Sequence, residues 1–367
     1  MSDALALALA TADDARLAGV AAEVGEPRYR VTQIRQAAWR RGATGFEAMT
    51  FLPAALRAHL AQRLRFHVLT EVATRTADRD LTHKLLLRAP DGQTVETVAM
   101  TYPARPPAHP RRTVCVSTQV GCAVGCAFCA TGQLGLRRHL TAAEITDQVL
   151  IAGRAWHAAG LPPPSHVVYM GMGEPLQNYQ PTLDSVRALI RWGVAARRIT
   201  ISTSGVVPAI DRLATERLPL RLAISLHAVD DELRTRLVPL NGRYPLADCL
   251  AAGARYAAAS GRRLSLEYVL IAGVNDRPED ARGLRRLAEQ TGAHVNLIPM
   301  NRIPGSAFTA PSPLEVRRFA VAVGGRASVR FSRGDRAAAA CGQLRAELAP
   351  RPAQLARTAR RLRLPVG

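Results

Sequence analysis

The sequence predicts an α/β protein whose larger part is a parallel sheet, wound or closed into a barrel. From residue 112 onward, short β-branched runs alternate with helical stretches, as in strands joined by crossover helices. Residues before about 70 carry apolar side chains at helical spacing, and the pair Asp91-Gly92 lies between two extended runs, which favours a β-hairpin. We therefore expect a small helical module, a hairpin extension and then the sheet.

The individual elements follow from local patterns. Two amphipathic segments, 30–41 and 52–64, predict helices on either side of a Gly-bearing segment. The Pro-rich segment 103–112 predicts a linker or loop. The expected strands of the sheet are 112–117, 166–170, 198–202, 221–225, 264–270, 294–298 and 327–331. These elements suggest a helical accessory domain (1–75), a hairpin and linker (76–111), a barrel domain (112–348) and a basic tail (349–367).

The charge of the chain is strongly positive. Lys and Arg number 49 and Asp and Glu 29, which gives a net charge of +20. Such an excess favours a polyanionic partner, most often nucleic acid, although an Arg-rich composition alone could also produce it. The segments 29–42 and 351–367 contain no acidic residue. Blocks of this kind often contact phosphates, but they also occur as solvated surfaces.

The first residues of the chain and its apolar runs indicate the cellular compartment. The first 20 residues are acidic and Ala-rich and lack the basic region of a signal peptide. No apolar run approaches the roughly 18 residues that span a bilayer. We therefore expect a cytoplasmic protein that does not cross a membrane and whose cysteines are reduced.

Three of the six cysteines lie close together as C-x3-C-x2-C, at Cys122, Cys126 and Cys129, directly after the first expected strand of the sheet. Thiolates bind zinc or iron–sulfur clusters. A cubane cluster held by three cysteines leaves one iron open, which can bind a substrate. Structural zinc takes four ligands, and Cys115 or His139 could supply the fourth. Zinc binding and a purely structural role therefore remain alternatives.

Polar and Gly-rich segments follow several of the expected strands. They are 171–175 (GMGEP), 202–205 (STSG), 225–228 (SLHA) and 299–301 (PMN). In parallel α/β folds, the loops after the carboxyl ends of the strands build the active site. The sequence therefore predicts that these segments and the cysteine loop share one end of the barrel.

The C-x3-C-x2-C motif and the GMGEP segment resemble the radical S-adenosylmethionine (SAM) superfamily. A longer series of motifs is similar, in order, to the RNA adenine methyltransferases of the RlmN and Cfr type. The series comprises VCVSTQVGCAVGCAFCATGQLGLRRHLTAAEI, GMGEPLQNY, ITISTSGVVPAI, AISLHA, EYVLIAGVND, HVNLIPMN and RGDRAAAACGQL. The resemblance covers residues 25 to 348, and YRVTQIRQAAWRRG resembles the family's N-terminal accessory module.

The resemblance implies a partial (β/α)6 radical SAM barrel and a set of cofactors. Cys122, Cys126 and Cys129 would hold a [4Fe-4S] cluster whose open iron binds SAM, and each turnover would use two SAM molecules. The residues implied to contact SAM are Gly173, Glu174, Ser202, Ser225, Leu226, His227 and Asn301.

Three further residues receive catalytic roles from the resemblance. Cys341 would take a methyl group from SAM, and after loss of a hydrogen atom the methyl carbon would add to adenine, which gives a covalent protein–RNA adduct. Cys115 would resolve the adduct by attacking the Cys341 sulfur, which gives a transient disulfide, and Glu96 would act as the general base. From the residues alone, the two cysteines are also compatible with core positions and Glu96 with a surface charge.

The implied function is methylation of carbon 2 of a specific adenosine in 23S rRNA, and of adenosine in some tRNAs. The expected partners are these RNAs and an electron donor such as flavodoxin, and the expected state is a monomer. Three alternatives stay open. They are a Cfr-like carbon 8 methyltransferase that confers ribosomal antibiotic resistance, a zinc-stabilised RNA-binding protein without catalysis, and a radical enzyme acting on a protein or a small molecule.

Overall fold

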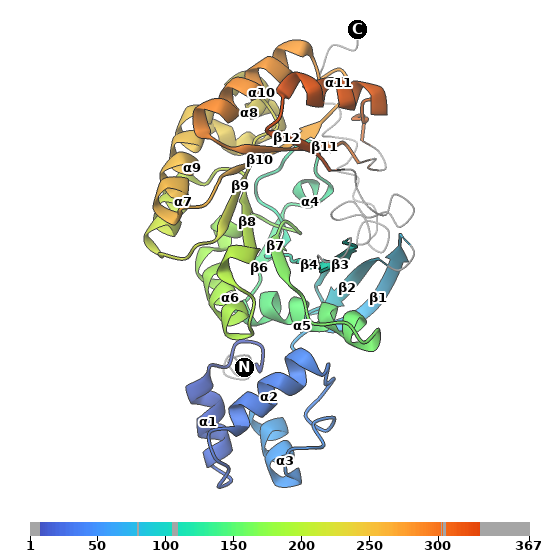
Figure 1. Ribbon diagram of the computed structural model, residues 1–367, viewed down its shortest axis with the longest axis vertical. Coiled ribbons are helices and arrows are strands. Elements are labelled where there is room, and N and C mark those ends of the chain that lie inside the picture. The colour runs from blue at the N-terminus through green and yellow to red at the C-terminus, as the bar shows by residue number, and fades with distance from the viewer. Residues whose placement is uncertain (1–7, 79–80, 105–108, 302, 304–305, 331–367) are drawn as a thin grey trace. The chain divides into compact units, whose positions relative to one another are not determined.

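The computed structural model describes residues 8–78, 81–104, 109–301, 303 and 306–330 (Figure 1). The chain folds as two compact units. The first comprises residues up to Thr118 together with Leu140–Gly171 and Asn178–Ile199. The second comprises Gln119–His139, Met172–Gln177 and the chain from Thr200 onward.

The first unit begins with three helices, α1 (Asp14–Ala22), α2 (Arg30–Arg40) and α3 (Ala54–Arg63). Helices α2 and α3 confirm the two amphipathic segments of the sequence. Helix α1 begins after Asp13, whose side chain accepts a hydrogen bond from the backbone N–H of Arg16 at 2.8 Å. Capping of this kind satisfies a backbone donor that the first helical turn leaves unpaired.

Strands β1 (Thr70–Ala77), β2 (Thr82–Arg88) and β3 (Thr94–Tyr102) follow and pair antiparallel. The β2–β3 hairpin was predicted, and Gly92 in its turn has a φ of 81°, a conformation that favours glycine. Strand β1 was not predicted, because residues 70–75 were grouped with the helical module. Every side chain of β1 is exposed or only half-buried, so the strand carries no apolar alternation and depends on backbone pairing with β2.

The first unit also contains two parallel strands, β4 (Arg111–Cys115) and β7 (His166–Tyr169). The strand order is β1-β2-β3-β4-β7. Helix α5 (Ala142–Ala158) packs on β2 and β3, and its Gln148 accepts a hydrogen bond from Thr97 of β3 at 2.8 Å. Helix α6 (Tyr179–Arg191) packs beside α5.

The second unit is a run of parallel strands and helices (Figure 1). The strands lie in the order β8 (Ile199–Thr203), β9 (Arg221–Ser225), β10 (Ser265–Leu270), β11 (His294–Pro299) and β12 (Ala327–Val329). The helices between them are α7 (Val207–Thr215), α8 (Asp231–Leu237), α9 (Leu246–Ser260), α10 (Pro278–Thr291) and α11 (Pro313–Val323). The α/β class is confirmed, and each of the seven predicted strands of the sheet is present, with ends that differ by no more than two residues from those expected. Residue 331, the last expected residue, is not described.

Shorter elements complete the chain. They are β5 (Gln119–Gly121), α4 (Ala130–Gln133), β6 (Leu136–His139) and the 3-10 turns Pro175–Asn178, Ala196–Arg198 and Pro239–Gly242. Strands β5 and β6 pair antiparallel and belong to the second unit. Across the described ranges, no helix combines the length and apolar character needed to cross a bilayer.

Candidate active site

The three clustered cysteines lie in the loop between β5 and β6, in the second unit. Pairing of Gln119 with His139 closes the loop at its base, and the N–H of Cys122 donates to the carbonyl of Gly135 at 3.1 Å. All three cysteines are half-buried free thiols. The short ladder therefore presents Cys122, Cys126 and Cys129 on one compact loop, as their spacing predicted.

This loop packs against the carboxyl ends of several strands. Its buried residues Val124, Ala127 and Ala130 share one apolar cluster with residues that follow β9, β10 and β11. The residues that follow these strands are Ala228, Ile271, Met300, Ile303 and Phe308. Cys122, Cys126 and Phe128 pack against the same cluster. The fold thus brings the cysteine loop to the end of the sheet where the sequence placed the other polar segments.

Burial disfavours the charged form of the cysteines. It raises the pKa of Cys122 to about 12 and that of Cys126 well above its ordinary value. The neighbouring cysteines and Glu174 raise both values further. Neighbouring thiolates need a positive charge among them, and iron would supply one when bound, because a coordinating thiol is deprotonated outright. The donor set and its surroundings therefore fit an iron–sulfur cluster.

A site for a single metal ion would need at least three ligand side chains close to one point. Within the described ranges, no three His, Cys, Asp or Glu side chains are grouped as ligands of one ion. Cysteines that each bound a separate iron of a cluster would not need to converge on one point, as the ligands of a single zinc must. His139, named above as an alternative zinc ligand, is exposed, and its Nδ1 lies 3.1 Å from the side-chain amide of Gln119.

The Gly-rich segment after β7 carries Gly173 and Glu174. Gly173 has a φ of 100°, and a Cβ there would lie 2.5 Å from the Cβ of Gln119, so only glycine fits. The Glu174 carboxylate is buried and accepts hydrogen bonds from the N–H of Ser204 at 2.7 Å and of Leu176 at 3.0 Å. Burial raises its pKa, and these amides oppose the shift. The side chain of Glu174 thus binds the loop after β8, and its own N–H donates to the side-chain oxygen of Gln119 at 2.8 Å.

Ser202 and Ser225 lie on the neighbouring strands β8 and β9, with their hydroxyl oxygens 3.4 Å apart. The buried Leu226 follows, and its N–H donates to the carbonyl of Glu267 at 2.9 Å. Asn301 is half-buried and follows β11, directly after Met300 of the apolar cluster. These predicted SAM residues therefore lie at the carboxyl ends of three strands of one unit.

His227 has the most constrained backbone of the predicted SAM residues. Its φ is 65°, in the left-handed region that residues other than glycine seldom adopt. The N–H of Val269 donates to its Nδ1 at 3.1 Å, so the ring proton resides on Nε2. The ring of Phe128 packs against it edge-on, with 4.7 Å between centroids. Burial lowers the pKa of His227 to about 3, which leaves the imidazole neutral at physiological pH.

Two of the three predicted catalytic residues lie in the first unit. Glu96 is 4% exposed, and its carboxylate lies 3.3 Å from the ammonium of Lys84, which is 1% exposed. Cys115 is buried and pairs with Val98 in the β3–β4 register. Because side chains two residues apart in a strand share a face, Glu96 and Cys115 lie on the same face of adjacent strands. Cys341 lies outside the described residues.

Sequence reasoning missed three buried polar residues. Lys84 pairs with Glu96, Arg234 binds carbonyls at the ends of β8 and β9, and Asn275 binds the carbonyl of His227. The burial of Lys84 could have been predicted, because it is the one charged residue in the apolar run KLLL. Asn275 lies in the quoted motif EYVLIAGVND, to which no role was assigned.

Proteins of similar sequence indicate the family of this chain. The family model of the Radical SAM superfamily matches residues 116–284. A protein of Moorella thermoacetica, named "Probable dual-specificity RNA methyltransferase RlmN", is 48% identical over 333 residues, 89% of this chain and 93% of that protein. A protein of the same name from Salinispora tropica is 48% identical over 341 residues, 89% of this chain and 90% of its own length.

A solved structure agrees with these relatives. The crystal structure of a radical SAM methyltransferase from Sphaerobacter thermophilus is 50% identical and superposes with a TM-score of 0.84, covering 92% of this chain and 98% of that one. None of these relatives supports the alternative of a zinc protein without catalysis. On its sequence and its fold, the chain belongs to the RlmN family of radical SAM RNA methyltransferases.

Proposed function

We propose that this protein methylates carbon 2 of a specific adenosine in 23S rRNA and of adenosine in some tRNAs. The observation that carries the proposal is the packing of the cysteine loop against the ends of β9, β10 and β11, beside residues predicted to contact SAM. The relatives from Moorella thermoacetica and Salinispora tropica are named as probable dual-specificity RNA methyltransferases, which supports an RNA substrate.

The site would hold its cofactors with the residues already described. Cys122, Cys126 and Cys129 would bind a [4Fe-4S] cluster, and two SAM molecules would be used in each turnover. When bound, the cluster and SAM supply a methyl donor and a carbon radical, which methylation of a non-nucleophilic ring carbon requires. The strand-end residues would orient SAM, and the apolar cluster of the second unit would exclude water from it.

Cys341 is proposed to carry the methyl group. Its thiolate would attack the SAM methyl carbon, and the carbon–sulfonium bond would break to leave S-methylcysteine and S-adenosylhomocysteine. A hydrogen atom would be removed from the S-methyl group, and the resulting carbon radical would add to the adenine carbon, which then loses one electron and its ring proton. The Cys115 thiolate would next attack the Cys341 sulfur. The sulfur–carbon bond then breaks, its electron pair passes to the nucleotide, and a disulfide forms that an external reductant must reopen.

Glu96 is proposed to take the proton from the adenine carbon. Its position on the same face as Cys115 supports a shared role, because both side chains would then face one substrate. The hairpin residue Lys84 provides the charge that a buried carboxylate needs. Substitution of Glu96 or of Lys84 should therefore impair turnover more than SAM binding.

RNA binding is proposed to involve the N-terminal helices. Two arginines of the acid-free segment are neutralised by acids outside it, Arg30 by Glu26 and Arg35 by Asp14, each at 2.7 Å. The remaining basic surface includes the exposed Arg41, whose guanidinium stacks over Phe51 at 4.7 Å. An arginine beside an exposed ring suits phosphates and unstacked bases.

The proposal also includes the cellular location, the oligomeric state and the electron donor. We infer a cytoplasmic monomer that receives its electron from a small donor such as flavodoxin. A reducing compartment keeps the cluster thiols available and supplies both the electron and the reductant for the disulfide.

Mass spectrometry of rRNA and tRNA nucleosides from a deletion strain tests the reaction. We expect loss of one 2-methyladenosine in 23S rRNA and in a subset of tRNAs, restored by the intact gene. Loss of 8-methyladenosine with 2-methyladenosine unchanged would overturn the carbon 2 proposal in favour of the Cfr-like alternative. No change in either RNA would overturn the RNA substrate itself.

The role of Cys341 is tested with purified protein. Cys341→Ala should abolish RNA methylation while the reconstituted protein still cleaves SAM to 5′-deoxyadenosine. Cys115→Ala should instead trap RNA covalently on the protein, visible as a slowly migrating band on a denaturing gel. Normal methylation by either variant would contradict the route through S-methylcysteine.

A further inference from the structure

The tripeptide Ser225-Leu226-His227 forms a turn at the end of β9 in which every backbone carbonyl is bound by a buried side chain. Arg234 binds the carbonyls of Ser225 and Leu226, and Asn275 binds that of His227. These are three consecutive residues predicted to contact SAM. The turn is therefore held from outside by two residues to which the proposed reaction gives no role.

Arg234 lies on α8 and is fully buried. Its Nε donates to the carbonyl of Leu226 at 3.1 Å, and its Nη2 donates to the carbonyls of Ser225 at 3.3 Å and Ser204 at 2.8 Å. Its Nη1 donates to the side chain of Asn241 at 2.6 Å. One guanidinium thus links the loop after β8, the turn after β9 and the turn that follows α8.

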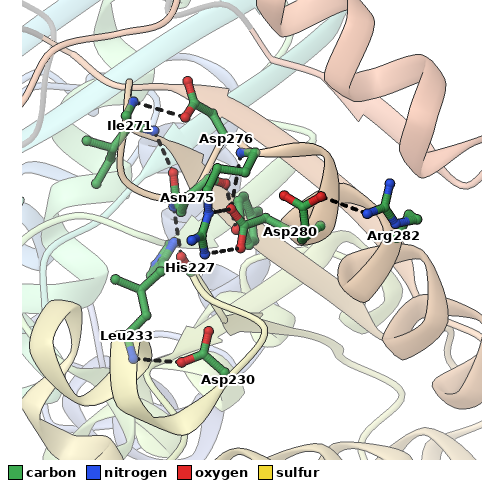
Figure 2. Close-up of polar contacts among 12 residues, drawn as sticks. His227, Asp230, Leu233, Ile271, Asn275, Asp276, Asp280 and Arg282 are labelled. Atoms are coloured by element: carbon green, nitrogen blue, oxygen red, sulfur yellow. Dashed lines mark hydrogen bonds and ion pairs between the residues drawn. The ribbon is translucent and has the colours of Figure 1, made fainter. Parts of the chain in front are cut away.

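Asn275 approaches the same turn from the loop after β10. Its side-chain amide donates to the carbonyls of His227 at 2.8 Å and Val269 at 2.7 Å, and its oxygen accepts from the N–H of Ile271 at 2.8 Å. Figure 2 shows Asn275 between Ile271 and His227 with a contact to each. All three hydrogen-bonding groups of the amide are directed at the backbone, so the position of the His227 carbonyl is closely specified.

These contacts stabilise a conformation that the chain would not adopt by itself. A non-glycine residue at a φ of 65° carries strain of about 1–3 kcal/mol, which surrounding contacts must offset. Strained backbone of this kind clusters at ligand sites, where it places groups before the ligand arrives. The His227 ring also contacts Phe128, between two cysteines of the motif, so the turn and the cysteine loop are held together.

We propose that Arg234 and Asn275 are positioning residues that hold the Ser225–His227 turn in its SAM-binding conformation before the cofactor arrives. The proposal rests on the proposed use of this turn in SAM binding. It assigns to each residue a contribution to cofactor affinity that does not depend on the RNA or on the carbon that is methylated.

Two conservative variants test the proposal in the full chain with its cluster reconstituted anaerobically. Arg234→Lys keeps the charge, but an ammonium cannot reproduce the planar fork that reaches four acceptors. Asn275→Asp keeps the shape and replaces the NH2 group, which donates to two carbonyls, by an oxygen that can only accept. Each variant should weaken SAM binding by about 10–100-fold, as is typical when a supporting contact behind a ligand site is lost. The measurement is isothermal titration with SAM in the absence of RNA and reductant.

Two control variants separate positioning from general destabilisation. Arg236→Lys lies on the same helix, where the arginine side chain is 44% exposed and 3.9 Å from Glu232, and it should leave the SAM dissociation constant within about twofold. Leu213→Ala removes a buried side chain of α7 and should lower the thermal midpoint without weakening SAM binding. Iron and sulfide content per chain is matched across all proteins.

The proposal is overturned if Arg234→Lys and Asn275→Asp bind SAM within twofold of the wild type. It is also overturned if Leu213→Ala weakens binding as much as they do, because the effect would then be general. If either variant fails to fold, amide hydrogen exchange of the wild-type protein still tests whether the turn is formed before SAM binds. The amides of Leu226 and Val269, which donate to Glu267 and His227, must be protected before SAM is added. Their free exchange without SAM would refute a preset turn.

The outcome is independent of the reaction proposed above. If nucleoside analysis reveals carbon 8 methylation, weaker SAM binding by the two variants still supports the positioning role. If the two variants bind SAM normally while the wild type produces 2-methyladenosine, the positioning role fails and the reaction stands.

Discussion

Replacing Lys84 with Met removes the positive member of a buried ion pair. The Lys84 ammonium lies 3.3 Å from the Glu96 carboxylate, and the two side chains are 1% and 4% exposed. Met occupies a similar volume without the charge, so the variant leaves Glu96 buried beside an apolar side chain. Lys84→Met is therefore expected to destabilise the fold, because it removes a positive charge that lies beside a buried carboxylate.

The expected size follows from the distance. Two unit charges 3.3 Å apart attract by about 5 kcal/mol at an effective dielectric constant of about 20. Loss of one partner of a buried pair costs about 3–5 kcal/mol in proteins. The variant Lys84→Met/Glu96→Leu removes both charges, and replacing both partners by apolar groups is often close to neutral. It should recover at least half of the loss.

Urea unfolding of the full chain under anaerobic conditions measures both effects. Far-UV circular dichroism gives the midpoint and the slope for the wild type, Lys84→Met, Glu96→Leu and the double variant, which together form a double-mutant cycle. The reasoning is refuted if Lys84→Met loses less than about 1 kcal/mol, or if the double variant is no more stable than the single one. Either result would mean that the pair is not held as two buried charges.

Three other perturbations have defined outcomes. Gly173→Ala places a Cβ 2.5 Å from Gln119 in a backbone with a positive φ. The control Gly292→Ala also has a positive φ but open surroundings, so Gly173→Ala should destabilise the fold by about 1–3 kcal/mol more. Equal urea midpoints for the two variants would contradict this. For His227, the folded-state pKa of about 3 lies below the unfolded value of about 6.5, so the unfolded state binds protons first as the pH falls. Stability should drop by about 2 kcal/mol between pH 7 and 5, and the difference in stability between wild type and His227→Asn should change by that amount; parallel pH profiles would refute the assignment. Arg41→Gln should weaken binding of an rRNA fragment and reduce the slope of log affinity against log salt by about 1, and an unchanged slope would exclude a phosphate contact.

The sequence by itself determined the class of fold and most of its elements. Alternating β-branched runs and helical stretches reflect local burial, which is why the strands β4 and β7 to β12 were found at their observed places. The Asp91-Gly92 turn could also be predicted from the sequence, because a tight hairpin needs a positive φ at a known position. The spacing of Cys122, Cys126 and Cys129 indicated cluster chemistry without any structure, since one short loop must carry all three thiolates.

Tertiary structure alone decided which distant residues meet. Strand β1 carries no apolar pattern and exists because β2 offers it a pairing edge. The Lys84–Glu96 pair, the carbonyl contacts of Arg234 and the left-handed backbone of His227 depend on neighbours that folding brings together. Periodicity reports whether a residue is buried but not what it is buried against. The partners of a buried polar group are set by packing between elements, which a one-dimensional pattern does not encode.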